Sequence, residues 1–345
     1  MKKVLVALSG GLDSAATALI LYERGYRVTG VTFDLTGDTQ NIESTRRLAE
    51  RLKIPLIVED IREEFRQAVQ HYFIDSYMRG ETPAPCSVCN PRIKWEVLRR
   101  VADREGIPLI ATGHYVRITE LSRFHYVTQG IDPVKDQSYY LWDLDQEILR
   151  RAVTPLGEFT KAQVRELMDF WGFIDLTAQK ESMGVCFLDK TGYAGFLRKN
   201  VPNIDRLSGG QVVDTKGQVI GSHSGYPFYT IGQKRGFTLD DPQDERYVLE
   251  IDAANNRLIV GSLQDLYTDT LFVRRPRIIN PEEFFSTDRL QVKVRGLGIN
   301  PEGFCTVTPT AEGIRVHVPC KAYAPAKGQP VVFYIDSRVV GGGYL

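Results

Sequence analysis

The feature that most constrains this chain is a short glycine-rich turn near its beginning. Residues 9–14 read Ser-Gly-Gly-Leu-Asp-Ser, between the apolar run Val4–Leu8 and the helix-like stretch Ala15–Glu23. A strand that turns at once into a helix leaves several backbone N–H groups pointing outward, with the positive end of the helix dipole behind them. The segment therefore predicts a phosphate-binding turn, with an ordinary glycine-rich turn as the alternative.

The residues of this turn have separate predicted roles. Gly10 and Gly11 allow a close backbone approach to a ligand, while Ser9 and Ser14 add hydroxyl donors. Asp13 can hold a Mg²⁺ ion or cap the helix. The Gly-Lys-Ser/Thr ending of a Walker loop is missing. The segment instead resembles the pyrophosphate-binding loop of the N-type ATP pyrophosphatases, which split ATP between its α and β phosphates to adenylate a substrate.

The remaining pattern predicts an α/β region followed by a β-rich region. Short apolar runs alternate with amphipathic helical patterns, which indicates a doubly wound parallel sheet with helices on both faces and a ligand at the carboxyl ends of the strands. The expected strands are Val4–Leu8, Val28–Phe33, Leu56–Val58 and Leu109–Ala111, and the expected helices are Ala15–Arg24, Ile42–Leu52, Phe65–Met78, Ile93–Arg104 and Lys161–Trp171, the last with a Thr160/Gln163 capping box. From about Ser208 short β-like runs dominate, at Gln211–Val213, Tyr247–Ile251, Leu258–Val260, Leu290–Val294, Ile314–Val318 and Val331–Ile335. We expect domains at 1–204, 205–267 and 268–345.

Composition leaves the partner open but indicates the compartment. With 345 residues, two or three domains are expected. Lys and Arg total 43, as do Asp and Glu, so a nucleic-acid surface would have to come from local clusters of charge. No apolar stretch approaches the roughly 20 residues of a membrane span, and Met1-Lys2-Lys3 runs straight into a core strand. We expect a cytoplasmic protein without a membrane partner.

Two closely spaced cysteines point to thiol chemistry. Cys86 and Cys89 lie in a proline-rich loop at the start of a predicted helix, with Arg92 and Lys94 near them in sequence. A thiol near a helix N-terminus and basic residues should have its pKa lowered toward the thiolate. Cys186 lies about a hundred residues later, and spacing alone leaves a buried, inert Cys186 as an alternative. The remaining cysteines are Cys305 and Cys320, and a total of five cysteines does not predict a framework of paired disulfides.

Taken together, the motifs resemble one family over nearly the whole chain. The matching segments are Ser9–Ser14, Cys89-Asn90 with Ile93-Lys94, Ala111–Tyr115, Lys135–Leu141, Gly184–Phe187, Tyr229–Gly236, Val332–Tyr334 and Gly341–Gly343. The chain resembles the bacterial tRNA-specific 2-thiouridylases of the N-type ATP pyrophosphatase superfamily. These enzymes place sulfur on C2 of the wobble uridine, position 34 of tRNA.

The resemblance implies a site and its partners. Cys89 and Cys186 would be the catalytic pair, together with Asp13. ATP would be bound by Ser9, Gly10, Gly11, Asp13, Ser14, Phe33 and Gly113, and tRNA by Lys94, His114, Lys135, Asp136, Gln137, Ser138, Gln233, Lys234 and Arg235. The implied fold is an adenine nucleotide α-hydrolase-like catalytic domain, a central β-rich adaptor and a C-terminal β-barrel that contacts tRNA. The implied cofactors are ATP and Mg²⁺, and the partners are tRNA and a sulfur donor, either a persulfide-carrying relay protein or sulfide. A monomer is expected, with a dimer as the alternative.

The chain also departs from the family pattern. Cys86 stands where many members have Asp, which creates Cys-x-x-Cys plus the distant Cys186. Three thiolates with one open position suit a 4Fe–4S cluster, as in the iron–sulfur tRNA thiolases; cluster-free persulfide chemistry is the alternative. A structural zinc site would need a fourth ligand, for which His114 is a candidate. Two other segments differ from the sequences usual in the family. The difference at residues 294–297 affects the expected RNA contacts of the C-terminal domain, and the difference at residues 33–35 affects the expected binding of adenine.

Two other classes of function remain open. A small-molecule synthetase with the same loop would explain Ser9–Ser14 but neither the cysteines nor the β-rich region. A tRNA-binding paralogue with an altered RNA target would be permitted by the altered C-terminal string. Basic residues that could contact phosphate, or simply be solvated, are Arg92, Lys94, Arg99, Arg100, Lys234, Arg235, Arg274, Arg275 and Arg277.

Overall fold

The computed structural model describes residues 1–179, 184–296 and 298–345, which form two compact units. The first unit comprises the described residues of Met1–Val69, Cys86–Met183 and Ser337–Val340. The second comprises Gln70–Pro85, the described residues of Gly184–Asp336, and Gly341–Leu345. Residues 180–183 and Leu297, the last residue of the altered C-terminal string, lie outside the described residues.

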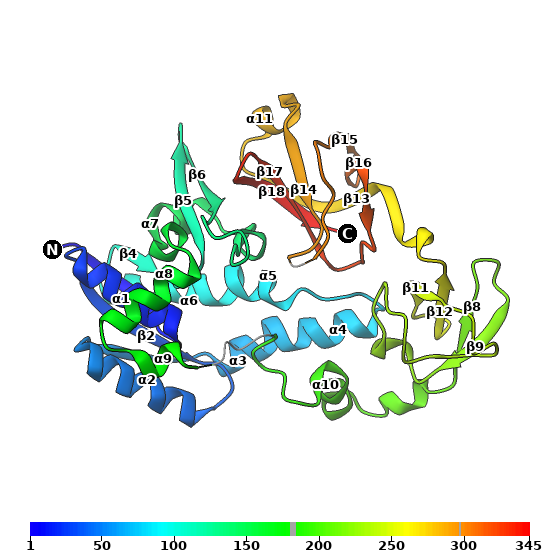
Figure 1. Ribbon diagram of the computed structural model, residues 1–345, viewed down its shortest axis with the longest axis horizontal. Helices are drawn as coiled ribbons and strands as arrows, with labels where there is room; N and C mark the ends of the chain where they lie inside the picture. Colours follow the sequence, from blue (N-terminus) through cyan, green and yellow to red (C-terminus); the bar gives the residue numbers. More distant parts are fainter. Residues whose placement is uncertain (180–183, 297) are drawn as a thin grey trace. The chain divides into compact units, whose positions relative to one another are not determined.

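The first unit is built on a parallel sheet, as the alternating pattern predicts (Figure 1). Its strands are β1 (Lys3–Ala7), β2 (Arg27–Asp34), β3 (Leu56–Asp60), β4 (Leu109–Ala111) and β7 (Ala152–Val153), in the order β3-β2-β1-β4-β7. Every paired neighbour is parallel. The chain steps from β1 to β2 to β3 in one direction and then returns to place β4 on the other side of β1. The carboxyl ends of β1 and β4 therefore flank the topological switch point, where open α/β sheets bind ligands.

The helices of the first unit connect and cover this sheet. They are α1 (Leu12–Glu23), α2 (Thr39–Leu52), α3 (Arg62–Phe65), α5 (Pro85–Cys89), α6 (Trp95–Arg104), α7 (Gln146–Arg151), α8 (Lys161–Phe170) and α9 (Ile174–Thr177). Ala18 and Leu21 of α1 pack in a core cluster with Val4 and Val6 of β1. A second face of α1 packs on α8, through residues that include Ala15 and Val164. The helix that follows the glycine-rich turn is thus held between the sheet and α8.

Two details of the first unit differ from the sequence-based expectation. Cys86 and Cys89 lie within α5 rather than in a loop, because Pro85 occupies the first helical position, where a missing N–H costs nothing. A single π-helical turn, Asn90–Lys94, joins α5 to α6. The antiparallel hairpin of β5 (Val116–Leu121) and β6 (Phe124–Gln129) was not expected.

The second unit is mostly antiparallel β-structure. Its central sheet contains β8 (Gly210–Val213), β9 (Val219–His223), β10 (Thr238–Leu239), β11 (Tyr247–Asp252) and β12 (Arg257–Gly261), in the order β10-β9-β8-β12-β11. The C-terminal strands are β13 (Tyr267–Ile278), β14 (Leu290–Lys293), β15 (Thr306–Thr310), β16 (Gly313–Tyr323), β17 (Pro330–Ile335) and β18 (Arg338–Tyr344), of which residues 338–340 belong to the first unit. The helices are α4 (Tyr72–Met78), α10 (Gly192–Asn200) and α11 (Pro281–Ser286).

Helix α4 explains why residues 70–85 belong to the second unit. Phe73 and Tyr77 of α4 are buried in the same core cluster as Val212 and Leu258 of the central sheet. The predicted helix Phe65–Met78 is therefore divided between the units, with a π-helical turn, Arg66–His71, between α3 and α4. None of the described helices is long and apolar enough to cross a bilayer.

Candidate nucleotide and thiol sites

The glycine-rich turn is closed by its own hydrogen bonds. The Ser9 N–H donates to Ser14 Oγ at 3.1 Å, and the Ser14 hydroxyl donates to the Gly11 carbonyl oxygen at 3.0 Å. Gly10 has φ +76°, which L side chains rarely adopt, and a Cβ there would lie 3.0 Å from the hydroxyl oxygens of Ser44 and Thr45 on α2. Ser14 is buried and shapes the turn, which leaves the more exposed Ser9 and the backbone N–H groups nearer to solvent.

The carboxylate of Asp13 is bound by two side chains from elsewhere in the first unit. The Lys161 ammonium, at the first position of α8, donates to Asp13 Oδ1 at 2.6 Å and to Oδ2 at 2.8 Å. The Tyr115 hydroxyl donates to Oδ1 at 2.8 Å. The side chain of Lys161 is only 12% exposed, against 37% for Asp13. Sequence reasoning missed Lys161. A cation at a helix N-terminus opposes the helix dipole, and this mismatch was the available signal.

The predicted Mg²⁺ site at Asp13 stays a prediction. Mg²⁺ in nucleotide sites is held by one or two carboxylates together with phosphate oxygens. Both oxygens of Asp13 accept hydrogen bonds from the Lys161 ammonium, so a metal ion there would share this carboxylate with a second positive charge. Across residues 1–179, 184–296 and 298–345, no three His, Cys, Asp or Glu side chains are grouped so as to hold a metal ion.

The loop after β4 lies against the glycine-rich turn. A Cβ at Gly113 would lie 3.0 Å from the backbone carbonyl carbon of Asp13, so this position requires glycine. Phe33, near the end of β2, lies at the same edge of the sheet, because the carboxyl ends of parallel strands share one edge. The structure thus brings together three of the segments predicted to bind ATP.

His114 is partly buried and held in an uncharged state. Its Nδ1 lies 2.8 Å from the Thr112 hydroxyl oxygen, and its ring stacks beside that of Trp95 with 6.1 Å between centroids. Burial lowers the pKa of His114 to about 3, and the nearby charge of Lys94 lowers it further. The imidazole is therefore neutral at pH 7. A zinc-binding role for His114 has no support from the described residues, which hold no such group of ligands.

The two thiols of α5 share one helical face and meet the Lys135–Leu141 segment. Cys86 is exposed and Cys89 is buried, and side chains three residues apart lie on the same side of a helix. The Asn90 carboxamide donates to the Tyr140 carbonyl oxygen at 3.3 Å. Burial, and then the negative charge of Cys86, raises the pKa of Tyr140. Two motifs about fifty residues apart in sequence are therefore neighbours.

Cys186 belongs to the second unit and is exposed. The alternative of a buried, inert Cys186 is therefore wrong. Its neighbour Phe187 anchors this segment, because its ring packs edge-on against Phe73 of α4, with 5.2 Å between centroids. The thiol is thus presented from a segment that is fixed to the core of the second unit.

The Lys135–Ser138 segment is stabilised by its own polar side chains. Asp136 accepts the Ser138 hydroxyl at 2.8 Å and the Ser138 N–H at 3.2 Å, and Ser138 is fully buried. Gln137 Oε1 accepts the N–H of Tyr115 at 3.0 Å. These bonds give Asp136, Gln137 and Ser138 a supporting role in the loop beside Tyr115. Their predicted contacts with tRNA stay predictions.

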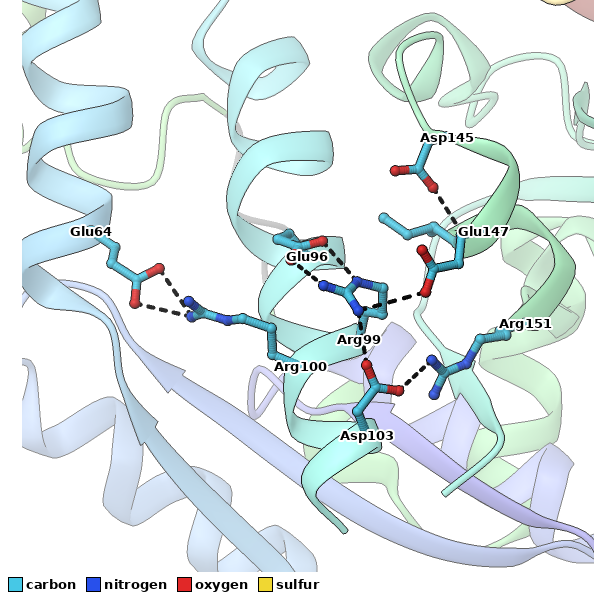
Figure 2. A network of polar contacts seen from close by, with 9 residues as sticks. Glu64, Glu96, Arg99, Arg100, Asp103, Asp145, Glu147 and Arg151 are labelled. Atoms are coloured by element: carbon cyan, nitrogen blue, oxygen red, sulfur yellow. Dashed lines mark hydrogen bonds and ion pairs between the residues drawn. The ribbon is translucent and has the colours of Figure 1, made fainter. Parts of the chain in front are cut away.

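Several of the basic residues are bound to carboxylates. Figure 2 shows Arg99 on α6 between Glu96 and Asp103, with nitrogen–oxygen distances of 2.6 and 2.8 Å, and Arg100 paired with Glu64 at 3.0 Å. In this conformation both arginines are paired with carboxylates, and their contact with phosphate stays a prediction.

The predicted tRNA contacts in the second unit have mixed surroundings. Lys234 pairs with Glu245 at 2.8 Å. Gln233 donates to the Arg235 carbonyl oxygen at 2.6 Å, while the Arg235 side chain is exposed. Exposed pairs of this kind contribute little stability, so RNA phosphate could replace Glu245 at small cost.

Comparisons with known proteins cover the whole chain. Three family models match: "tRNA methyl transferase HUP domain" over residues 2–190, "tRNA methyl transferase PRC-barrel domain" over 195–262 and "Aminomethyltransferase beta-barrel domain" over 268–345. They confirm the predicted fold class of an α/β domain, a small β-rich domain and a C-terminal β-barrel. The predicted boundaries at 204 and 267 stay predictions.

Curated relatives agree over nearly their full length. The tRNA-specific 2-thiouridylase MnmA 2 of Phocaeicola vulgatus is 41% identical, covering 99% of this chain and 97% of the relative. The tRNA-specific 2-thiouridylase MnmA 1 of Bacteroides fragilis is 40% identical, covering 100% and 97%. A solved 4-thiouridine synthetase–RNA complex with bound ATP overlaps only partly, at 16% identity over 59% of this chain and 51% of that chain, with a TM-score of 0.37. On the evidence of the full-length relatives, this chain belongs to the family of the tRNA-specific 2-thiouridylases.

Proposed function

We propose that this protein uses ATP to replace the C2 oxygen of the wobble uridine of tRNA with sulfur. The observation that carries the proposal is the identity of about 40% with tRNA-specific 2-thiouridylases along the entire chain. The geometry supports it, because a phosphate-binding turn and a helix that bears two cysteines belong to the same unit.

The first step would be activation of the uridine by ATP. A carbonyl oxygen is a poor leaving group, so the C2 oxygen would attack the α-phosphate and expel pyrophosphate. Backbone N–H groups of the turn at Gly10 and Gly11, with the N-terminus of α1 behind them, would bind the negative charge. ATP would enter as its Mg²⁺ complex, with phosphate oxygens and water as the principal ligands of the ion.

The second step would be attack by sulfur on C2, with AMP as the leaving group. In the persulfide route, the terminal sulfur of a Cys186 persulfide bonds to C2 and AMP leaves with the former C2 oxygen. The Cys89 thiolate then attacks the Cys186 sulfur, which releases 2-thiouridine and leaves a Cys89–Cys186 disulfide. A dithiol reductant must supply two electrons before the next turnover. Alternatively, Cys86, Cys89 and Cys186, which are not grouped for metal binding among the described residues, would come together to hold a 4Fe–4S cluster, which supplies an iron with an open coordination position.

The proposal includes partners that the comparisons leave open. In the persulfide route the sulfur would come from a persulfide-carrying relay protein, and in the cluster route it would come from sulfide. The target uridine must leave the anticodon stack to reach the sheet edge, so we propose that the β-rich domains bind the tRNA body. The reaction would take place in the cytoplasm, where tRNA is used, and a monomer would suffice.

One assay distinguishes this proposal from its alternatives. ATP–pyrophosphate exchange should depend on added tRNA, and anaerobic incubation with ATP, tRNA and a sulfur source, either sulfide or a persulfide donor, should form 2-thiouridine. A small-molecule synthetase would show no tRNA dependence. A paralogue without turnover would bind tRNA but show neither exchange nor thiolation.

A further inference from the structure

Lys161 occupies an unfavourable position for a lysine unless it has a specific role. Its side chain is only 12% exposed, and the residue occupies the first position of α8, where the helix dipole opposes a positive charge. The ion pair with Asp13 offsets that cost. Such an ion pair is weak evidence for a contribution to stability, because desolvation of the largely buried Lys161 offsets much of its attraction to the more exposed Asp13. The pair therefore needs an explanation beyond folding.

The location of the Lys161–Asp13 ion pair supplies this explanation. Asp13 belongs to the turn that presents backbone N–H groups to phosphate, and an unpaired carboxylate there would repel a triphosphate. The Lys161 ammonium removes that repulsion. Lysine also binds phosphate as a point charge on a flexible four-carbon stem, so the same ammonium can turn from carboxylate to phosphate without movement of the helix.

The surrounding contacts leave the side chain of Lys161 as the part that can change partner. Its backbone N–H donates to Asp132 Oδ2 at 2.9 Å, and the Thr160–Gln163 capping box fixes the start of α8. Asp13 would keep a partner if the ammonium left, because the Tyr115 hydroxyl donates to Oδ1 at 2.8 Å. The backbone at Lys161 is thus fixed, its ammonium can change partner, and the Asp13 carboxylate has a second hydrogen-bond donor.

We propose that Lys161 is an ATP-binding residue whose ammonium contacts the pyrophosphate portion of the nucleotide, with Asp13 as its holder in the nucleotide-free protein. This inference rests on the proposed use of ATP. It assigns to an amino-acid side chain the positive charge that the sequence analysis expected a metal ion to supply at Asp13.

The test compares ATP with AMP, which lacks the pyrophosphate. Dissociation constants for both nucleotides would be measured by isothermal titration calorimetry on the full-length protein and on Lys161→Met. We expect Lys161→Met to weaken ATP binding roughly tenfold or more and to change AMP binding less than about twofold, as for loss of one charge-assisted contact to phosphate. Equal losses for the two nucleotides, or no loss for ATP, would overturn the proposal.

A matched control addresses the fold of α8. Gln163→Ala removes the capping box of the same helix but leaves the ammonium in place, so it should bind ATP as the wild type does. If Gln163→Ala weakens ATP binding as much as Lys161→Met, the effect is structural and the proposal is wrong.

A double variant separates contact with phosphate from simple neutralisation of Asp13. In Asp13→Asn/Lys161→Met the repelling carboxylate is gone and no buried charge is left unpaired. If Lys161 contacts phosphate, ATP binding stays weak in the double variant; if Lys161 only neutralises Asp13, binding returns to the wild-type value and the inference fails. A wild-type protein that binds no ATP would instead refute the proposed function itself.

Discussion

Asp13 is the side chain on which most contacts of the nucleotide site converge. The sequence predicts its importance, because the Ser-Gly-Gly-Leu-Asp-Ser turn follows a buried strand and precedes a helix. It does not predict the partner, because Lys161 lies 148 residues further along the chain and is one of several lysines in amphipathic helices. Local patterns indicate local chemistry, whereas an ion pair between distant elements depends on how those elements pack.

We predict that Asp13→Asn reduces tRNA-dependent adenylation by about a hundredfold or more, in the range seen when a positioned electrostatic group is lost from an active site. The carboxamide carries no charge, so the Lys161 ammonium would no longer be held beside the turn in the nucleotide-free protein, where incoming ATP meets it. Binding of tRNA should stay within about twofold of the wild type, since this side chain is assigned to phosphate and not to RNA. Pyrophosphate release and a filter-binding assay measure the two quantities. Parallel loss of tRNA affinity would contradict the assignment of Asp13.

We predict an acid sensitivity that originates at His114. Burial lowers its folded-state pKa to about 3, whereas the unfolded value is near 6.5, so between these pH values the unfolded chain binds the extra proton. Stability from this residue is complete above pH 6.5 and falls as the pH decreases, by about 2 kcal/mol at pH 5. Between pH 7 and pH 5 the free energy of unfolding should therefore decrease less for His114→Gln than for the wild type.

Tryptophan fluorescence during urea unfolding can follow this prediction, because all three tryptophans, Trp95, Trp142 and Trp171, lie in the first unit. An identical pH dependence in the two proteins would show that His114 is protonated equally in the folded and unfolded states.

The elements of the first unit were largely predictable, and the errors have physical reasons. Strands β1, β2 and β4 are short apolar runs whose side chains fill the core, so burial leaves a clear signal. The hairpin β5–β6 was missed because its outer positions are polar and its sequence resembles a loop. Helix α5 was expected to be a loop because prolines suggested an irregular segment, although Pro85 is compatible with a helix start.

The basic residues on different elements should contribute differently to RNA binding. We predict that Lys234→Ala weakens tRNA binding and reduces the dependence of log K on log[salt] by about one unit, because one phosphate contact is lost. Arg99→Ala is the matched control, since Arg99 is held by two carboxylates and is 25% exposed, whereas Lys234 pairs with Glu245 and is 40% exposed. For Arg99→Ala, the slope of log K against log[salt] should equal that of the wild type. Binding measured by fluorescence anisotropy at several salt concentrations distinguishes the two, and an unchanged slope for Lys234→Ala would mean that this lysine is only solvated.

The division of the chain into two units bears on the chemistry as a whole. Cys86 and Cys89 belong to the first unit, with the nucleotide turn, and Cys186 belongs to the second, with the β-rich domains. The sequence predicted an α/β part and a β-rich part because the hydrophobic period changes along the chain. It could not predict that residues 70–85 join the second unit, because α4 is an ordinary amphipathic helix whose packing partners are distant strands and the Phe187 segment.

The final prediction separates the two routes of sulfur transfer at Cys86. If Cys86, Cys89 and Cys186 hold a 4Fe–4S cluster, Cys86→Ala should lose bound iron and 2-thiouridine formation together, because two thiolates rarely retain a cubane. If a persulfide on Cys186 is the sulfur carrier, Cys86→Ala should keep most of its activity without iron. Cys89→Ala and Cys186→Ala should then each abolish activity, because that route needs one carrier and one resolving thiol.

Cys320→Ala, which replaces an exposed cysteine of the β16 strand, is the control and should match the wild type in both measurements. The assay would measure iron content and 2-thiouridine under anaerobic conditions, with sulfide as the sulfur source in one arm and a persulfide donor in the other. An active, iron-free Cys86→Ala protein would exclude the cluster while leaving Cys89 and Cys186 as the reacting pair.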